Sequence, residues 1–233
     1  MLPGDVLLVT GNSSFSNALV LGQKAIYLKA KSSHVELSLG DGVFIHATDD
    51  GGVHLSLLID EVNSCREGWR VIRHKSIVEL GLETEKLQKS GMFFYAQGYN
   101  KVYMGSGTKS SSFCSELVAK VYEKSGIRII NGKAPSKVAP AHFDKEADEM
   151  IDWIDVTAEY KEILEDMTKD IFPYRLMMQT LTQVMTRRKL HEGIRESIIT
   201  RLENGTEGER KAAVEYKKML HDRELSFWYE KNR

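Results

Sequence analysis

The sequence predicts an α+β fold, in which an antiparallel sheet with packed helices is followed by a C-terminal helical extension. Three observations support this prediction. A strand and a helix precede a run of strands that are joined by tight turns. The composition is globular, with 42% apolar residues in a chain of 233, which is enough for a buried core. The density of charged residues also changes sharply near residue 157.

This change in charge density indicates two units. Residues 157–233 include 29 charged side chains in 77 positions, about 38%, whereas residues 1–156 include 36, about 23%. Glycine and β-branched residues are concentrated in the first part, while apolar residues in the second recur at helical spacing. We therefore expect a main domain over residues 1–156 and a helical subdomain over residues 157–233, which docks on that domain or on a partner because its large apolar side chains need cover.

Short apolar or alternating runs predict the strands of the main domain, at residues 5–10, 34–39, 43–47, 53–57 and 69–73. In the second run, His34 and Glu36 share one face and apolar side chains occupy the other. Asp41-Gly42 is a hairpin turn signal. A turn centred there pairs residue 37 with residue 46, so a contact between His34 and His46 would be diagonal and would depend on the register.

Helices are expected over residues 13–31, 78–100 and 113–124 in the main domain. In the C-terminal part, Pro173 separates two helices and Asn204-Gly205 ends the second. Thr206 with Glu209 is a capping-box signature for a last helix, which carries Phe227 on its apolar face.

Composition also argues against several classes of protein. The chain has 32 basic and 33 acidic residues, so the basic excess of a nucleic-acid-binding protein is missing. No apolar run approaches the roughly 20 residues of a membrane span, and the N-terminus lacks the basic start of a signal peptide. We expect the chain to be cytoplasmic at synthesis. Two cysteines, Cys65 and Cys114, cannot form a disulfide framework, although one bridge between them remains open.

Cys114 is the first candidate for chemistry. It follows a Gly/Ser-rich loop and opens an expected helix capped by Ser112, where free N–H groups favour a thiolate and a pKa below about 8.5. The alternative is a buried core cysteine, because Cys114 also belongs to the apolar stripe of that helix.

His34 is the candidate general base for this thiol, since it lies on the polar face of its strand. His46 either orients His34 through the far ring nitrogen or is a buried polar residue. His34, His46, His54, Cys65 and Cys114 are all potential zinc ligands, but their spacing matches no zinc motif. We expect no metal and no cofactor.

Several segments, in this order, resemble the permuted NlpC/P60 group of papain-like thiol hydrolases, the YiiX/YaeF type. Ser33-His34-Val35-Glu36-Leu37 resembles the histidine strand of that family, and Phe113-Cys114-Ser115-Glu116-Leu117-Val118 resembles its nucleophile helix. The similarity extends to Gly4-Asp5-Val6-Leu7, to residues 43–53 and to Ala134-Pro135-Ser136. It covers roughly residues 1–155.

The resemblance implies a cysteine peptidase or amidase that works through a thioacyl intermediate. Cys114 would be the nucleophile, His34 the base and His46 the third, orienting residue, where permuted members often have glutamate. The C-terminal part has no counterpart in the minimal fold. By analogy it suggests an exported antibacterial effector, or toxin, with a secretion or immunity partner.

Three functions remain open on these grounds. The first is hydrolysis of peptidoglycan peptides. The second is an acyltransferase or lipid-amide hydrolase acting on an acyl-amide substrate. The third is a non-catalytic binding module on the same fold.

Overall fold

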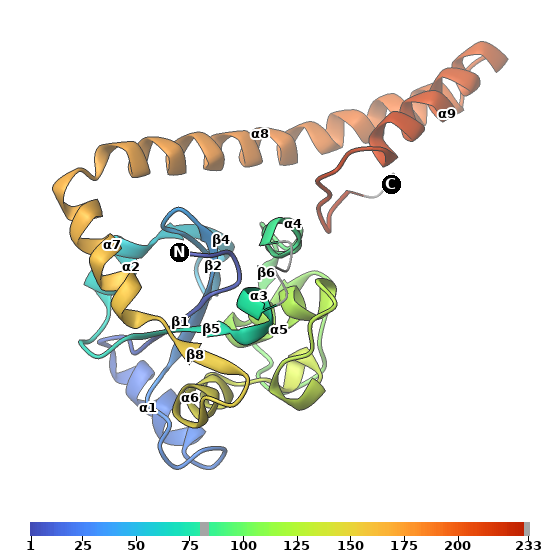
Figure 1. Ribbon diagram of the computed structural model, residues 1–233. Helices are drawn as coiled ribbons and strands as arrows, with labels where there is room; N and C mark the ends of the chain where they lie inside the picture. Colours follow the sequence, from blue (N-terminus) through green and yellow to red (C-terminus); the bar gives the residue numbers. More distant parts are fainter. Residues whose placement is uncertain (80–83, 231–233) are drawn as a thin grey trace.

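The computed structural model describes residues 1–79 and 84–230 and has a six-stranded antiparallel sheet at its centre (Figure 1). The strands lie in the order β4-β3-β2-β1-β5-β8. They are β1 (Val6–Val9), β2 (His34–Gly40), β3 (Val43–Thr48), β4 (Gly52–Leu57), β5 (Arg70–His74) and β8 (Trp153–Asp155). Two further strands of two residues each, β6 (Gly98–Tyr99) and β7 (Ser111–Ser112), pair in parallel.

Helices cover both faces of this sheet. Helix α5 (Cys114–Lys124) packs on β2 and β3 together with α4 (Thr84–Phe93). The opposite face is covered by α2 (Leu58–Ser64) and α7 (Thr157–Lys169), and its core includes Leu7, Phe44 and Tyr160. The remaining helices are α1 (Ser14–Gln23), α3 (Lys75–Glu79), α6 (Pro140–Glu149), α8 (Phe172–Glu203) and α9 (Glu207–His221), with short 3₁₀ turns at Ile130–Gly132 and Pro135–Lys137.

The predicted fold class is confirmed, and the five predicted strands form within one or two residues of their expected bounds. The sequence pattern does not predict β8, because three residues are too short for a periodic signal. This strand pairs with β5, and its Trp153 is fully buried among aromatic neighbours. The division into two domains near residue 157 stays a prediction.

The predicted helices differ from the structure mainly in length. Helix α1 ends at Gln23, and the helix predicted over residues 78–100 appears as α3 and α4, with residues 80–83 outside the described part of the chain. The breaks at Pro173 and Asn204-Gly205 and the capping box of Thr206 with Glu209 are confirmed. Phe227 does not belong to α9, which ends six residues earlier.

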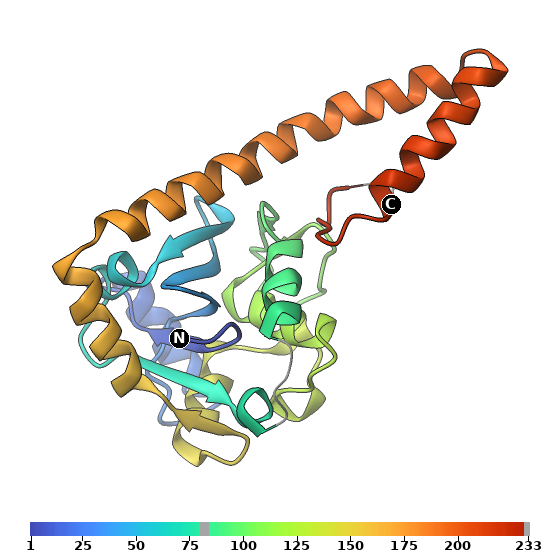
Figure 2. The ribbon, with the colours of Figure 1, turned by 45° about the horizontal axis from the view of Figure 1, so that its top comes forward.

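The C-terminal helices pack on the sheet at their start and project from it further on (Figures 1 and 2). Tyr160 and Met167 of α7 are fully buried against the sheet. Helix α8 passes β4 and runs outward, and α9 folds back along it. The chain then returns to α4, where Trp228 donates hydrogen bonds from its backbone N to Phe93 O at 3.0 Å and from Nε1 to Tyr95 O at 2.9 Å. Within the described residues, none of the helices combines the length and apolar character of a membrane span.

We expect truncation after Val156 to destabilise the chain strongly. The fragment would lose Tyr160 and Met167, whose burial contributes about 1.5–3 kcal/mol each, and would expose Phe44 and Leu7 on the uncovered face. Denaturant unfolding of the fragment and of the full chain measures the difference. A soluble fragment with the stability of the full chain would contradict the docking of this segment.

Candidate active site

Cys114 lies in the first turn of α5, as the sequence predicts, but it is the first residue of the helix, because the residue at the N-cap is Phe113 rather than Ser112. The backbone N–H of Phe113 donates to the Glu116 carboxylate at 3.3 Å, so the side chain of Glu116, in the first turn, caps the N-terminus of the helix. Ser112 lies on β7, where its hydroxyl donates to Gln97 Oε1 at 2.8 Å. The backbone N–H of Cys114 is one of the N–H groups that a helix leaves without an intrahelical partner.

A β-bulge decides which face of the sheet carries the histidines. At the Asp41-Gly42 turn, Gly40 pairs with Val43, as expected, but the register shifts between Ser38 and Gly40. From there Leu37 pairs with Ile45 instead of residue 46. A one-residue shift moves a side chain to the other face. The observed register places Glu36 opposite His46, with His34 diagonal to His46 on the same face.

Three histidines form a hydrogen-bonded chain across β2, β3 and β4. His34 Nε2 lies 3.0 Å from His46 Nδ1, and His46 Nε2 lies 2.9 Å from His54 Nε2. His54 Nδ1 lies 3.0 Å from Gly52 O, which can only accept a hydrogen bond. In the neutral chain, His54 therefore donates from Nδ1 to Gly52 O, His46 donates from Nε2 to His54, and His34 donates from Nε2 to His46.

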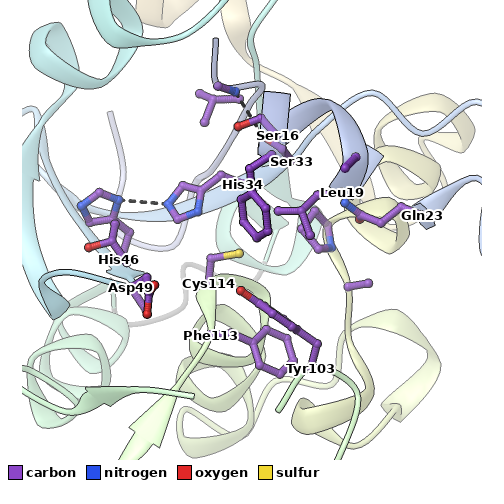
Figure 3. A pocket seen from close by; sticks show the side chains of 18 of the residues that line it. Ser16, Leu19, Gln23, Ser33, His34, His46, Asp49, Tyr103, Phe113 and Cys114 are labelled. Atoms are coloured by element: carbon purple, nitrogen blue, oxygen red, sulfur yellow. Dashed lines mark hydrogen bonds between the residues drawn. The ribbon is translucent and has the colours of Figure 1, made fainter. Parts of the chain in front are cut away.

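This order of donors leaves His34 Nδ1 as an unprotonated nitrogen. Burial lowers the pKa of all three histidines, and the pKa of His34 falls well below its ordinary value, also because of the neighbouring imidazoles. The three imidazoles are thus neutral near pH 7. His34 and Cys114 line the same cavity, and Figure 3 shows His34 between His46 and Cys114. The structure therefore brings together the three predicted site residues, while their catalytic roles stay predictions.

Two carboxyl side chains, those of Glu36 and Glu61, lie next to the three hydrogen-bonded histidines. Glu36 is fully buried on β2, with Oε1 3.4 Å from His46 Nδ1 and 3.7 Å from His34 Nε2. Glu61 on α2 is hydrogen-bonded to Glu36, and its Oε1 lies 3.8 Å from His46 Nε2. Burial raises the pKa of both side chains to about 7, and for Glu61 the charge of Glu36 adds to this effect. His34, Glu36 and His46 are also the residues that could hold a metal ion here.

The prediction of a lowered pKa for Cys114 is wrong for the substrate-free chain. Its side chain is buried, and burial raises the pKa of the thiol to about 11, although hydrogen bonds from the backbone at Val35 and Ser115 act in the opposite direction. Desolvation of the thiolate thus outweighs the helix N-terminus. The resting pair is a neutral thiol and a neutral imidazole.

Cys65 lines the same cavity, but its surroundings favour the thiol form. It ends α2, where its thiol donates to Val62 O and Arg66 O, both at 3.4 Å, and burial raises its pKa to about 11. A helix C-terminus disfavours an anion, whereas the N-terminus at Cys114 favours one. Both cysteines are free, so the bridge left open by the sequence does not form.

We expect iodoacetamide to modify both cysteines slowly at pH 7, because a pKa of about 11 leaves about one thiol in 10⁴ ionised. The rate should rise about tenfold per pH unit up to about pH 10, since alkylation follows the thiolate fraction. Peptide mass spectrometry over a pH series separates Cys114 from Cys65. A plateau for Cys114 below pH 8 would contradict the raised pKa and restore the sequence prediction.

The cavity beside the thiol has a volume of about 560 Å³ and mostly apolar walls. On one side α1 and the segment after it contribute Phe15, Leu19 and Ile26. Tyr103 and Phe113 lie on the other side, and Figure 3 shows the Tyr103 side chain directed toward Cys114. Among the described residues, no lysine or arginine lines the cavity.

Several neighbours of the site were not predicted as part of it. The sequence indicates Glu36 only as part of the motif of its strand and His54 only as a potential zinc ligand, and it gives no signal for Glu61, Tyr99 or Tyr103. The alternation of β2 places Glu36 beside His34, which was a usable signal. The loop that carries Tyr103 has no periodic pattern, so only the tertiary structure places it at the cavity.

Comparisons with known proteins identify a distant structural neighbour but show no family for this chain. No protein-family model matches the chain, and no curated protein matches it. Among solved structures, the chain is similar to the crystal structure of metalloprotein yiiX from Escherichia coli O157:H7, with a TM-score of 0.44 and 21% identity. The match covers 53% of this chain and 66% of that one, just under two thirds of its length. Membership of the NlpC/P60 family stays a prediction.

Proposed function

We propose that this protein is a cysteine-dependent amide hydrolase in which Cys114 is the nucleophile and His34 the general base. The observation that carries the proposal is the hydrogen-bonded chain from Gly52 O to His34, which leaves Nδ1 of His34 free to accept a proton beside the cavity that Cys114 lines. A general base needs this unprotonated nitrogen within reach of the nucleophile.

The proposed reaction has two halves. The Cys114 sulfur attacks the amide carbonyl while its proton passes to His34 Nδ1, and the backbone N–H of Cys114 donates a hydrogen bond to the developing oxyanion. His34 returns the proton to the leaving amine, and a thioester remains on Cys114. A water molecule, deprotonated by His34, then attacks the thioester, and the acid and the free thiol are released.

The walls of the cavity favour an apolar acyl group as the part of the substrate held beside Cys114. Phe15 and Ile26 line the cavity and are 60% and 43% exposed, so they offer an apolar entrance as well as a wall. Peptidoglycan stem peptides have several carboxylates, and a cavity whose described lining includes Asp49 and Glu61 but no lysine or arginine offers them no partner. We therefore place acyl amides ahead of peptidoglycan peptides as the substrate class.

Mass spectrometry tests the proposal directly. We expect N-acyl amides to be cleaved at rates that rise as the acyl chain lengthens, and an acyl mass to appear on Cys114 in the intact protein. Transfer of the acyl group to an added amine would identify an acyltransferase instead. Cleavage of stem peptides with inert acyl amides would reverse the choice of substrate, and a chain inert toward both would be a binding module.

We expect His46→Ala to lower turnover by at least tenfold, because His34 then has no acceptor for its Nε2–H and loses its preferred tautomer and orientation. His46→Asn should recover part of the rate, since an amide oxygen can accept that hydrogen bond. Turnover is compared per folded molecule, with thermal melts as the stability control. A lower melting temperature with unchanged turnover would show that His46 is only a buried polar residue.

A further inference from the structure

Three donor atoms of the histidine and glutamate cluster form a small triangle. His34 Nε2, His46 Nδ1 and Glu36 Oε1 are separated by 3.0, 3.4 and 3.7 Å. Tetrahedral zinc has Zn–N and Zn–O distances of about 2.0–2.2 Å, which places neighbouring ligand atoms about 3.3–3.6 Å apart. The 3.4 Å edge lies within this range and the edges of 3.0 and 3.7 Å lie close to it, so small shifts of these side chains would form one face of a tetrahedral site.

Oε1 of Glu36 is a buried oxygen without a hydrogen-bond partner among the described residues, although the side chain as a whole also has Glu61 as a neighbour. Glu36 is fully buried, and its Oε2 accepts from the Ser56 hydroxyl at 3.4 Å. Within residues 1–79 and 84–230, no lysine or arginine forms an ion pair with Glu36 or Glu61. The ionised form of a buried carboxyl group is costly without a cation, and a divalent ion at this point would stabilise that form.

We propose that His34, Glu36 and His46 bind a divalent transition-metal ion of the zinc type, and that the bound ion inhibits the proposed hydrolase. Two imidazoles and one carboxylate are a donor set that zinc accepts in proteins. His34 and His46 line the cavity, so its water can supply a fourth ligand. The sequence expectation of no metal is replaced by this proposal.

Inhibition follows from the tautomer of His34, and this half of the proposal rests on the proposed function. To bind the ion, His34 must offer the lone pair of Nε2, which now donates to His46. The proton of the neutral ring then moves to Nδ1. His34 can no longer accept the proton of Cys114, so the ion and the general base exclude each other.

Metal binding is tested by titrating the full chain with Zn²⁺ in competition with a chromophoric chelator. We expect one equivalent per chain, and at least tenfold weaker binding in Glu36→Gln and in His34→Gln. Cys114→Ser should bind like the unmodified chain, because the thiol is outside the donor triangle. Circular dichroism shows whether either ligand variant is misfolded. If one of them is, the metal affinity of the other still tests the site.

Co²⁺ in place of Zn²⁺ reports the ligand type. We expect visible absorption of a tetrahedral site without a thiolate charge-transfer band. Unaltered affinity in both Glu36→Gln and His34→Gln, loss of affinity in Cys114→Ser, or a thiolate band would each overturn the assignment.

The inhibitory half has a separate readout. Turnover of an N-acyl amide should fall in proportion to the Zn²⁺ occupancy measured by titration and return on addition of chelator. In Glu36→Gln, scaled to its own rate without metal, inhibition should require more Zn²⁺ by the factor found for binding. Binding without inhibition would overturn the inhibitory half alone. A metal-free chain without turnover would overturn the proposed function and this half with it, whereas the binding result would stand.

Discussion

Cys114→Ala is expected to abolish turnover of an acyl amide, with a loss of at least about 10⁴ in kcat. The reason is that the thioester cannot form without the thiol, and the helix N-terminus and cavity that remain supply only binding and oxyanion contacts. Steady-state hydrolysis, with mass spectrometry of the intact protein for the acyl intermediate, measures both consequences of the change.

The matched control is Cys65→Ala, since Cys65 lines the same cavity but lies at the C-terminus of α2. We expect it to retain turnover within about twofold. His34→Ala should lose nearly as much activity as Cys114→Ala, and the double variant should lose no more than the worse single variant, because residues that act as a unit are not additive. Activity that survives in Cys114→Ala and disappears in Cys65→Ala would move the nucleophile to the other thiol.

Among single substitutions, the largest loss of stability is expected for Asp5→Ala. Asp5 is fully buried and accepts hydrogen bonds from Arg73 Nε at 2.7 Å and Nη2 at 2.8 Å, from the Tyr160 hydroxyl at 2.6 Å and from Leu2 N at 3.0 Å. It thereby joins β1, β5 and α7. Removing it leaves the buried guanidinium of Arg73 without its main partner, and breaking such a pair costs about 3–5 kcal/mol.

Glu159→Gln is the comparison for this variant. Glu159 also pairs with Arg73, at 2.9 Å, but its side chain is half exposed, so its loss should cost about 1 kcal/mol or less. Urea unfolding of both variants at one pH provides the measurement. Similar losses in the two variants would show that the buried network does not hold α7 on the sheet.

Local pattern by itself determined much of the secondary structure. The five main strands, the helix that begins at Cys114, the break at Pro173 and the capping box of Thr206 all follow from signals within a few residues of each element. These signals were sufficient because propensity, caps and alternation act over one or two turns of chain. Local signals, together with the order of the motifs, also predict the candidate pair of Cys114 and His34.

The tertiary structure alone decided the chemistry of that pair. The bulge between Ser38 and Gly40 selects the face on which His46 meets His34 and Glu36, and no local signal announces an extra residue in a strand. The return of Phe227 to the main body is likewise a long-range contact that no helical pattern encodes.

Burial explains why the protonation state of Cys114 differs from the one that the sequence predicts. The local view placed Cys114 at a helix N-terminus and predicted a thiolate, while the folded chain surrounds the thiol with core side chains and raises its pKa to about 11. The pKa of a buried group depends on the solvent that the whole fold removes from it. That loss of solvent is not a property of any one segment of the sequence, so the position of Cys114 at the helix N-terminus could be predicted locally and its protonation state could not.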